Sequence, residues 1–241
     1  MKRNKVYIWV ITLFMLTACT DLDVVPENGL PSNLAFTTSD AYRSYLAKVY
    51  ASFSLTGQDG PNGDSDISIV NDEGFTSYIR AYWKAQELTT DEAVIAWTDA
   101  GIRDLHEFSW SSENQFVKVL YYRISLIVSL ANDFLSLSEE DRMDLHGVPE
   151  ADRAEIRAYR NDARFLRALA YWHALDLFRN VVLAEDVSVG FPAQASPQEL
   201  FDFIASELAA IEADLPAPRS GDYGRVDQGG VWMLQAKLYL N

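Results

Sequence analysis

Apolar residues recur every three or four positions over several long stretches of the chain, a spacing that predicts amphipathic α-helices. The first such helix begins at about Thr38 or Ser39 and ends before Gly57. Its buried face is predicted to consist of Ala41, Tyr42, Tyr45, Leu46, Val49, Tyr50 and Phe53. Residues 58–73 are rich in Gly, Asp, Asn and Pro, so they are predicted to form a loop.

Two long helices are predicted farther along the chain. Ser112 and Gln115 have the spacing of a capping box at the start of a helix over about residues 113–137. Pro149 precedes the second helix, over about residues 150–178, where apolar side chains again recur at helical spacing.

The last third of the chain predicts two more helices. Ser196 and Glu199 form a second capping-box pattern, and the helix that they start runs to about Leu215. The final helix begins near Gly230 and is still in progress at Asn241, without a glycine cap or a polar tail. We therefore expect the chain to be truncated at its C-terminus.

These elements predict an all-α fold. Helix–loop–helix pairs with short connections stack into α-solenoids of the tetratricopeptide (TPR) type, and few stretches of this chain alternate as strands do. The strict 34-residue repeat signature is not found, so the TPR-like assignment depends on the order of the elements alone. Long irregular loops interrupt the solenoid.

The N-terminus has the pattern of a secretory signal. Three basic residues among the first five precede an apolar run over residues 6–16, which is too short to span a hydrocarbon core of ~30 Å. The sequence LTAC of residues 16–19 resembles the lipobox of bacterial lipoproteins, in which the peptidase cuts before the cysteine and the thiol carries diacylglycerol. We expect residues 1–18 to be a signal peptide and Cys19 to be lipidated. The alternative is a coincidental cysteine near an ordinary cleavage site.

Residues 19–36 are predicted to be an extended, lipidated linker that leads into a helical domain over residues 37–241. Asp21 and Asp23 follow the cysteine closely and resemble the acidic export tag of Bacteroidetes surface lipoproteins. The predicted location is the outer membrane, lipid-anchored and facing the cell exterior. A short acidic linker that merely keeps the tether solvated is the alternative.

Composition excludes several classes of function. With 35 acidic and 20 basic residues, the net charge of −15 argues against a nucleic-acid partner. One cysteine can form neither an internal disulfide nor a Cys-based zinc site, and the three histidines lack metal-type spacing. No nucleophile elbow or phosphate-binding glycine loop is present, so neither an enzyme nor a cofactor or metal is predicted. The 6 Trp, 12 Tyr and 12 Phe exceed what a core needs, so some rings should be displayed.

The ARFLRALAYW of residues 163–172 and the LDLF of residues 175–178 resemble the central signature of the SusD/RagB family. Four other segments agree with the family pattern in order, and these are residues 19–26, 87–92, 224–226 and 234–241. Members of this family are surface lipoproteins that deliver glycans to TonB-dependent (SusC-like) transporters. They are normally much longer, so the chain corresponds to their N-terminal part.

The resemblance implies a non-catalytic protein that binds an oligosaccharide and passes it to a TonB-dependent outer-membrane transporter. The similarity is closest to the starch-binding prototype of the family, so starch or malto-oligosaccharides are the favoured ligands. Two alternatives remain open. The cargo is another glycan or a peptide, or the solenoid is a scaffold that contacts only the transporter.

The same resemblance implies a ligand site. Trp97 falls on an aromatic residue of the prototype's sugar platform, and Arg80 falls on an arginine that reaches sugar hydroxyls. Asp72 lies in a stretch that resembles the prototype, whereas Ala100 replaces its asparagine, a loss for which Asp99 would have to compensate. Sugar sites combine a flat ring with forked hydrogen-bonding groups. The alternatives are a half-buried core role for Trp97 and an ion pair between Arg80 and a nearby acid.

Two further sets of residues are expected to serve the fold. Tyr82 and Trp83 lie at helical spacing and should pack inside. Arg164 and Arg167 lie on one helical face of the signature segment and should form exposed pairs with acids such as Asp162 or Asp176.

Overall fold

The computed structural model describes residues 35–57, 66–68, 77–187, 190 and 192–240. The predicted signal peptide, Cys19 and Asp72 lie outside these residues. The described helices belong to one compact unit, Phe36–Asn241. None of its helices, within the residues described, is both long and apolar enough to cross a membrane.

Eight α-helices make up the described part of this unit, in agreement with the predicted all-α class. They are α3 (Ser39–Ala51), α4 (Tyr78–Glu87), α5 (Ile102–Glu107), α6 (Gln115–Leu137), α7 (Glu140–Leu145), α8 (Glu150–Phe178), α9 (Pro197–Ile211) and α10 (Gln228–Leu240). A short 3-10 helix, Glu212–Asp214, extends α9. One isolated antiparallel bridge joins Val182 and Gln194.

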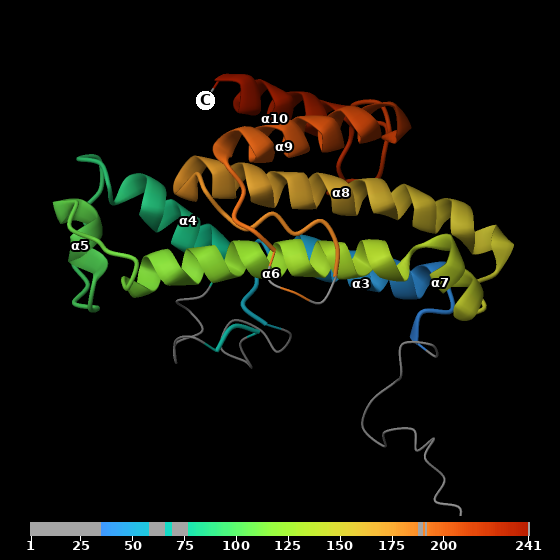
Figure 1. Cartoon of the computed structure of the whole chain (residues 1–241), viewed down its shortest axis with the longest axis horizontal. Helices are drawn as coiled ribbons and strands as arrows, with labels where there is room; N and C mark the ends of the chain where they lie inside the picture. Colours follow the sequence, from blue (N-terminus) through green and yellow to red (C-terminus); the bar gives the residue numbers. More distant parts are fainter. Residues whose placement is uncertain (1–34, 58–65, 69–76, 188–189, 191, 241) are drawn as a thin grey trace, which may run out of the picture. The chain divides into compact units, whose positions relative to one another are not determined.

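The helices stack in layers around α8 (Figure 1). α8 packs against α6 on one side and α9 on the other, and α10 lies on the outer side of α9. α3 packs against both α8 and α6, while α4 packs against α6. This stacking of helical hairpins is the predicted TPR-like arrangement.

Side-chain caps fix where two of these helices begin. At α9 the predicted capping box is present, because Ser196 Oγ accepts from Glu199 N at 3.3 Å and Glu199 Oε2 accepts from Ser196 N at 2.7 Å. The predicted box at α6 is wrong. Asn114 caps this helix instead, and its Oδ1 accepts from Phe116 N at 3.0 Å. Asn is as favourable as Ser at this position, and it stands directly before the first helical residue.

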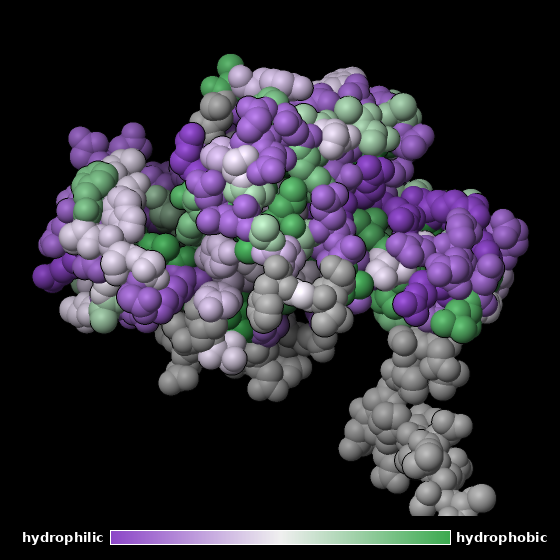
Figure 2. Space-filling view, viewed as in Figure 1, coloured by the Kyte–Doolittle hydropathy of each residue, from purple (hydrophilic) through white to green (hydrophobic). Residues whose placement is uncertain are grey.

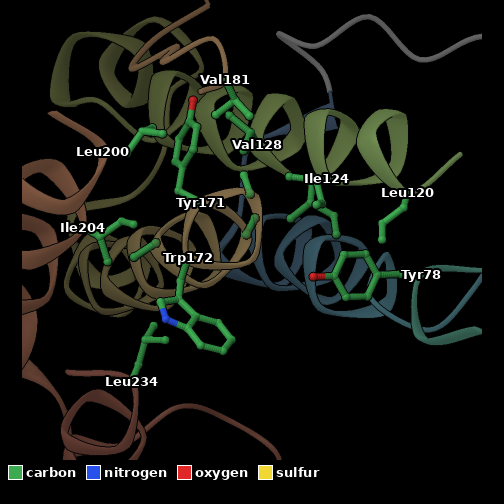
Figure 3. Packing of buried hydrophobic residues seen from close by; sticks show 14 of the residues in the cluster. Tyr78, Leu120, Ile124, Val128, Tyr171, Trp172, Val181, Leu200, Ile204 and Leu234 are labelled. Atoms are coloured by element: carbon green, nitrogen blue, oxygen red, sulfur yellow. The ribbon is translucent and has the colours of Figure 1, made fainter. Parts of the chain in front are cut away.

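Buried apolar side chains form two clusters. The first is shared by α4, α5, α6, α8, α9 and α10, and Figure 3 shows Tyr78, Tyr171 and Trp172 within it. The second joins α3, α6, α7 and α8. Tyr82 packs against the first cluster as predicted, but the prediction for Trp83 is wrong, since this side chain is 48% exposed. Residues 78, 81 and 84 of α4 face inward, and Trp83 belongs to the opposite side of the helix.

A buried ion pair ties distant segments together. Arg225 donates two hydrogen bonds of 2.9 Å to Asp162 of α8, whose side chain is 1% exposed. Tyr50 of α3 donates its hydroxyl proton to the same carboxylate at 2.8 Å, and it accepts from the amide of Val226 at 3.0 Å. The Gly-Arg-Val stretch at residues 224–226 is therefore held against α3 and α8.

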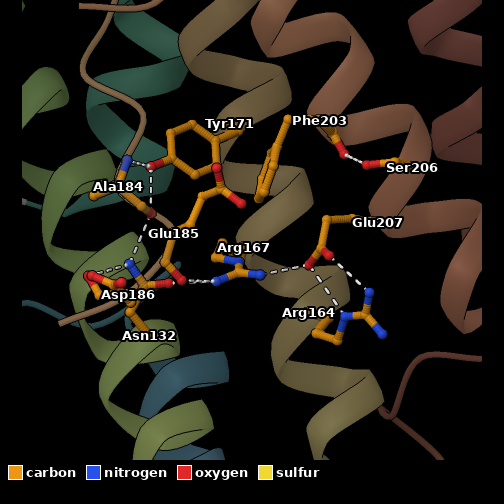
Figure 4. Close-up of polar contacts among 10 residues, drawn as sticks. All are labelled: Asn132, Arg164, Arg167, Tyr171, Ala184, Glu185, Asp186, Phe203, Ser206 and Glu207. Atoms are coloured by element: carbon orange, nitrogen blue, oxygen red, sulfur yellow. Dashed lines mark hydrogen bonds and ion pairs between the residues drawn. The ribbon is translucent and has the colours of Figure 1, made fainter. Parts of the chain in front are cut away.

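The two signature arginines also serve the fold, but with another partner than predicted. Figure 4 shows Arg164 and Arg167 of α8 converging on Glu207 of α9, at 2.8 and 2.7 Å. Arg167 donates in addition to Asn132 Oδ1 of α6 at 2.6 Å. The prediction of exposed pairs with Asp162 or Asp176 is wrong, because the shared face of these arginines is covered by α9.

Candidate functional site

The connection between α4 and α6, residues 88–114, contains the best-formed candidate for a ligand site. It is irregular apart from α5 and is pinned to the start of α6. Gln115 Nε2 donates to the carbonyl of Ala100 at 2.6 Å, and Asn114 Nδ2 donates to the carbonyl of Gly101 at 2.7 Å. Gly101 has φ +83°, and a Cβ there would lie 2.9 Å from Asn114 Nδ2. These contacts give the connection a fixed path although it lies on the surface.

Trp97 is the central side chain of this connection. The residue is 49% exposed, compared with 8% for Trp172 in the core. The ammonium group of Lys84, from α4, lies 5.2 Å from the centroid of the indole ring. The same group lies 4.6 Å from the ring centroid of Phe116 on α6. The Trp97 ring is thus held over a cation while half of its surface faces solvent, an arrangement that fits a binding platform better than a core role.

Lys84 is the residue of this site that sequence reasoning missed. It is 2% exposed, although lysine is almost never fully buried without a partner. A signal was available in the helical spacing of α4, because Tyr78, Ala81 and Lys84 occupy the inward positions. A charged residue in an apolar stripe indicates a group that contacts something specific, and here it contacts two rings.

The other predicted ligand residues have different positions. Arg80 is exposed on α4, one turn before Lys84. Asp99 is exposed on the same connection as Trp97, and its carbonyl accepts from the amide of Ile102 at 3.2 Å. Asp72, and any pairing of Arg80 with it, lies outside the described residues. The structure therefore places Trp97 and Asp99 on one connection and Arg80 on the helix that leads into it.

The exposed side chains at this site offer groups suited to ligand recognition. An exposed indole offers a flat apolar surface, and a guanidinium and a carboxylate can make forked hydrogen bonds to hydroxyl groups. Ala100 contributes no side-chain donor or acceptor, and its carbonyl is already used by Gln115. Hydrogen bonds to a ligand beside Trp97 would thus have to come from other residues, such as Asp99 and Arg80.

A polar cavity of about 610 Å³ lies elsewhere, between α8, the C-terminal half of α6 and residues 185–187. Four arginines from one side of α8 line it. Arg160 donates to Leu135 O and Ser138 Oγ, and burial lowers its pKa. Arg164 and Arg167 bind Glu207, while Arg157 binds Glu140. Because these guanidinium groups already bind other residues of the protein, we assign the cavity to the packing of α6 on α8 and not to a ligand site.

His173 illustrates a buried polar group that serves packing. It is predicted to be a helix residue with a satisfied ring nitrogen, and this is confirmed by a hydrogen bond between its Nδ1 and the Tyr78 hydroxyl. The centroid of the His173 ring also lies 4.6 Å from the ring centroid of Tyr82 and 4.8 Å from that of Trp172. Burial lowers the pKa of His173 from 6.5 to about 4, so the imidazole is neutral at pH 7.

Comparison with known proteins extends these observations. No family model matches the chain. The chain is 35% identical, over 228 residues, to the starch-binding protein SusD of Bacteroides thetaiotaomicron. The matched region covers 94% of this chain and 38% of the relative.

Solved structures share the fold at lower identity. A SusD homologue from Bacteroides thetaiotaomicron has 20% identity and a TM-score of 0.65, covering 86% of this chain and 37% of its own. A laminarin-binding SusD-like protein has 20% identity and a TM-score of 0.62, and the match covers 85% of this chain and 40% of that protein. Surface glycan-binding protein A from Bacteroides uniformis has 19% identity and a TM-score of 0.64, and the match covers 84% of this chain and 42% of that protein. The chain thus spans about two fifths of the length of these proteins.

Proposed function

Since the chain is a homologue of the starch-binding protein SusD, we propose that it binds glycans without catalysis and that Trp97 is the platform for the sugar. The observation that carries this proposal is the half-exposed Trp97 ring, held in place over the buried ammonium of Lys84. Starch and malto-oligosaccharides are the favoured ligands because the relative named above is starch-binding.

The geometry explains how such binding would work. The C–H face of a pyranose stacks on an aromatic ring and buries a large apolar area at little cost in conformational entropy. Lys84 and the pinned connection hold the Trp97 ring in one orientation before the ligand arrives, so less ordering is needed on binding. Arg80 and Asp99 are then available for hydroxyl groups that extend beyond the ring.

The N-terminal sequence indicates where in the cell the protein would bind its ligand. A lipidated Cys19 would anchor the domain to the outer membrane through a linker of residues 19–36, and we propose that it faces the cell exterior. Acyl chains give stable anchoring when more than one is attached, and a linker of this length would let the domain move near the membrane. We further propose that the bound oligosaccharide passes from here to a TonB-dependent transporter.

Affinity electrophoresis tests the proposed binding. The chain from Thr20 onward would be run through gels that contain starch, another α-glucan or the β-glucan laminarin. We expect starch to retard the chain and Trp97→Ala to abolish the retardation while circular dichroism stays unchanged. Trp232→Ala is the matched control, since Trp232 is 48% exposed on α10, and it should be retarded like the parent.

A specific observation supports a second candidate, a SusD-like protein for another cargo. Ala100 cannot supply the side-chain amide of the starch-binding prototype, and its carbonyl is occupied by Gln115. Retardation by laminarin alone would select a β-glucan. Absence of retardation by every glycan would contradict the proposed function and leave a peptide cargo or a scaffold that contacts only the transporter.

The proposed anchor has its own test. The complete chain would be expressed in a Bacteroides host, and lipid incorporation and membrane fractionation would be measured. We expect Cys19→Ser to abolish lipid labelling and release the protein from the membrane fraction. A Cys19→Ser variant that stays in the membrane fraction would contradict lipidation as the means of attachment.

A further inference from the structure

We infer that Phe108 and Trp110 form a second aromatic contact for an extended oligosaccharide whose first sugars are bound at Trp97. This inference deepens the proposed function and rests on it. It concerns two residues that follow α5 on the same pinned connection, residues 88–114.

Both rings are displayed rather than buried. Phe108 is 68% exposed and Trp110 is 41% exposed, and their ring centroids lie 5.7 Å apart with an angle of 42° between the planes. At the end of the molecule that carries α5, Figure 2 shows some green, apolar surface mixed with white and purple residues. Two large rings that contact each other while facing solvent give an apolar surface of a size that suits stacking on a sugar.

The backbone at Phe108 adds an independent observation. The residue ends α5 with φ +55° and ψ +33°, in the left-handed region where glycine is the usual residue. A bulky side chain is strained in that conformation, and burial does not compensate because two thirds of Phe108 faces solvent. Strained residues of this kind concentrate at functional sites, where the surroundings hold them in place.

Hydrogen bonds link the two ring sites. The amide of Ser109 donates to the carbonyl of Asp104 at 3.0 Å, and Asp104 Oδ2 accepts from Asn114 Nδ2 at 3.1 Å. The same Asn114 Nδ2 donates to Gly101 O, and Ala100, next to Gly101, is held by Gln115. The path from Phe108 back to the Trp97 connection is therefore fixed by two side chains at the start of α6, which keeps both ring sites on one anchored segment.

The test uses isothermal titration with maltotriose and maltoheptaose, and with laminarin oligosaccharides of the same two lengths. The proteins are the chain from Thr20 and its variants Trp97→Ala, Phe108→Gly and Trp110→Ala. We expect Phe108→Gly and Trp110→Ala each to weaken binding of the longer sugar about three- to tenfold and of the shorter sugar less than twofold. Tyr223→Ala, which removes a fully exposed ring elsewhere, should change neither.

Thermal unfolding separates this role from a structural one. Glycine relieves the strain at residue 108, so Phe108→Gly should unfold at the same or a higher temperature than the parent while binding the longer sugar more weakly. This variant keeps the test decisive even if Trp110→Ala is destabilised.

The outcomes distinguish this inference from the proposed function. If Trp97→Ala abolishes binding but Phe108→Gly and Trp110→Ala bind both lengths like the parent, the second contact is wrong and the Trp97 site stands. Equal weakening of both lengths would place the two rings at the first sugars and overturn the extended arrangement. A parent chain that binds no oligosaccharide of either kind would overturn both proposals.

Discussion

The signature helix α8 and the connection between α4 and α6 use their polar and aromatic residues in opposite ways. On α8, Asp162 and Arg167 are almost fully buried and bound to residues of other segments. On the connection, Trp97 presents about half of its surface to solvent and Phe108 about two thirds. The segment that is easiest to recognise in the sequence therefore holds the fold together, whereas the candidate site lies on a less distinctive loop.

This division has a physical cause. A long helix covered on several sides must satisfy every buried charge, so its arginines and acids need partners on particular neighbouring helices. A surface connection needs only a few contacts to fix its path, here including those of Asn114 and Gln115, and its exposed side chains can meet a ligand. Changes on α8 should thus affect stability, and changes on the connection should affect binding.

The largest loss of stability is expected for Asp162→Ala. The substitution leaves Arg225 and the Tyr50 hydroxyl without their shared carboxylate, and breaking a buried pair in this way costs about 3–5 kcal/mol. Urea unfolding would measure the loss. Asp222→Ala is the control, because Asp222 also contacts Arg225, at 3.9 Å, but its side chain is 85% exposed, so little change is expected.

Glu207→Gln should cost less, roughly 2–3 kcal/mol at pH 7, since Arg164 is partly exposed and the glutamine keeps some hydrogen bonds. Burial alone would raise the pKa of Glu207, but the hydrogen bonds from Arg164 and Arg167 outweigh it and hold the pKa below its usual value of 4.5.

The sign of the pH dependence follows from that lowered pKa. The stabilisation by Glu207 is present above pH 4.5 and is lost as the pH falls through the lower value of the folded state. Unfolding of the parent and of Glu207→Gln, measured from pH 7 to pH 3, should therefore converge at low pH. A constant difference between them would contradict the role assigned to the carboxylate.

His173 predicts a smaller change in stability, at less acidic pH than that of Glu207. Its pKa of about 4 in the folded state lies below 6.5, so the unfolded chain binds more protons between these values. Stability should fall by roughly 2 kcal/mol from pH 7 to pH 5 on account of this group. His173→Gln should flatten that slope, and an unchanged slope would show that the folded imidazole titrates normally.

Sequence reasoning succeeded where spacing alone determines the structure. The bounds of α8 and the capping box of Ser196 were predictable because helical periodicity and cap chemistry are local. The Asn114 cap was missed because Ser112 offered a competing pattern of the same kind.

What escaped prediction depends on contacts between distant segments. The partner of Arg164 could not be chosen among many acids until α9 was placed on α8. Lys84 was missed for the same reason, since only the packing of α4 on α6 shows that its ammonium lies between two rings. Trp97 was identified as a candidate by resemblance, but its exposed fraction required the fold.

A small loss of stability is expected for Trp97→Ala, and this variant separates the two regions most sharply. The half-exposed ring and its contact with Lys84 should contribute about 1 kcal/mol to the free energy of unfolding. Trp172→Ala, which removes the same side chain from a site that is 8% exposed on α8, should cost about 3–5 kcal/mol. Urea unfolding of both variants provides the measurement. If the two losses were equal, Trp97 would be a core residue, and any loss of glycan binding in its alanine variant would reflect a damaged fold instead of a missing platform.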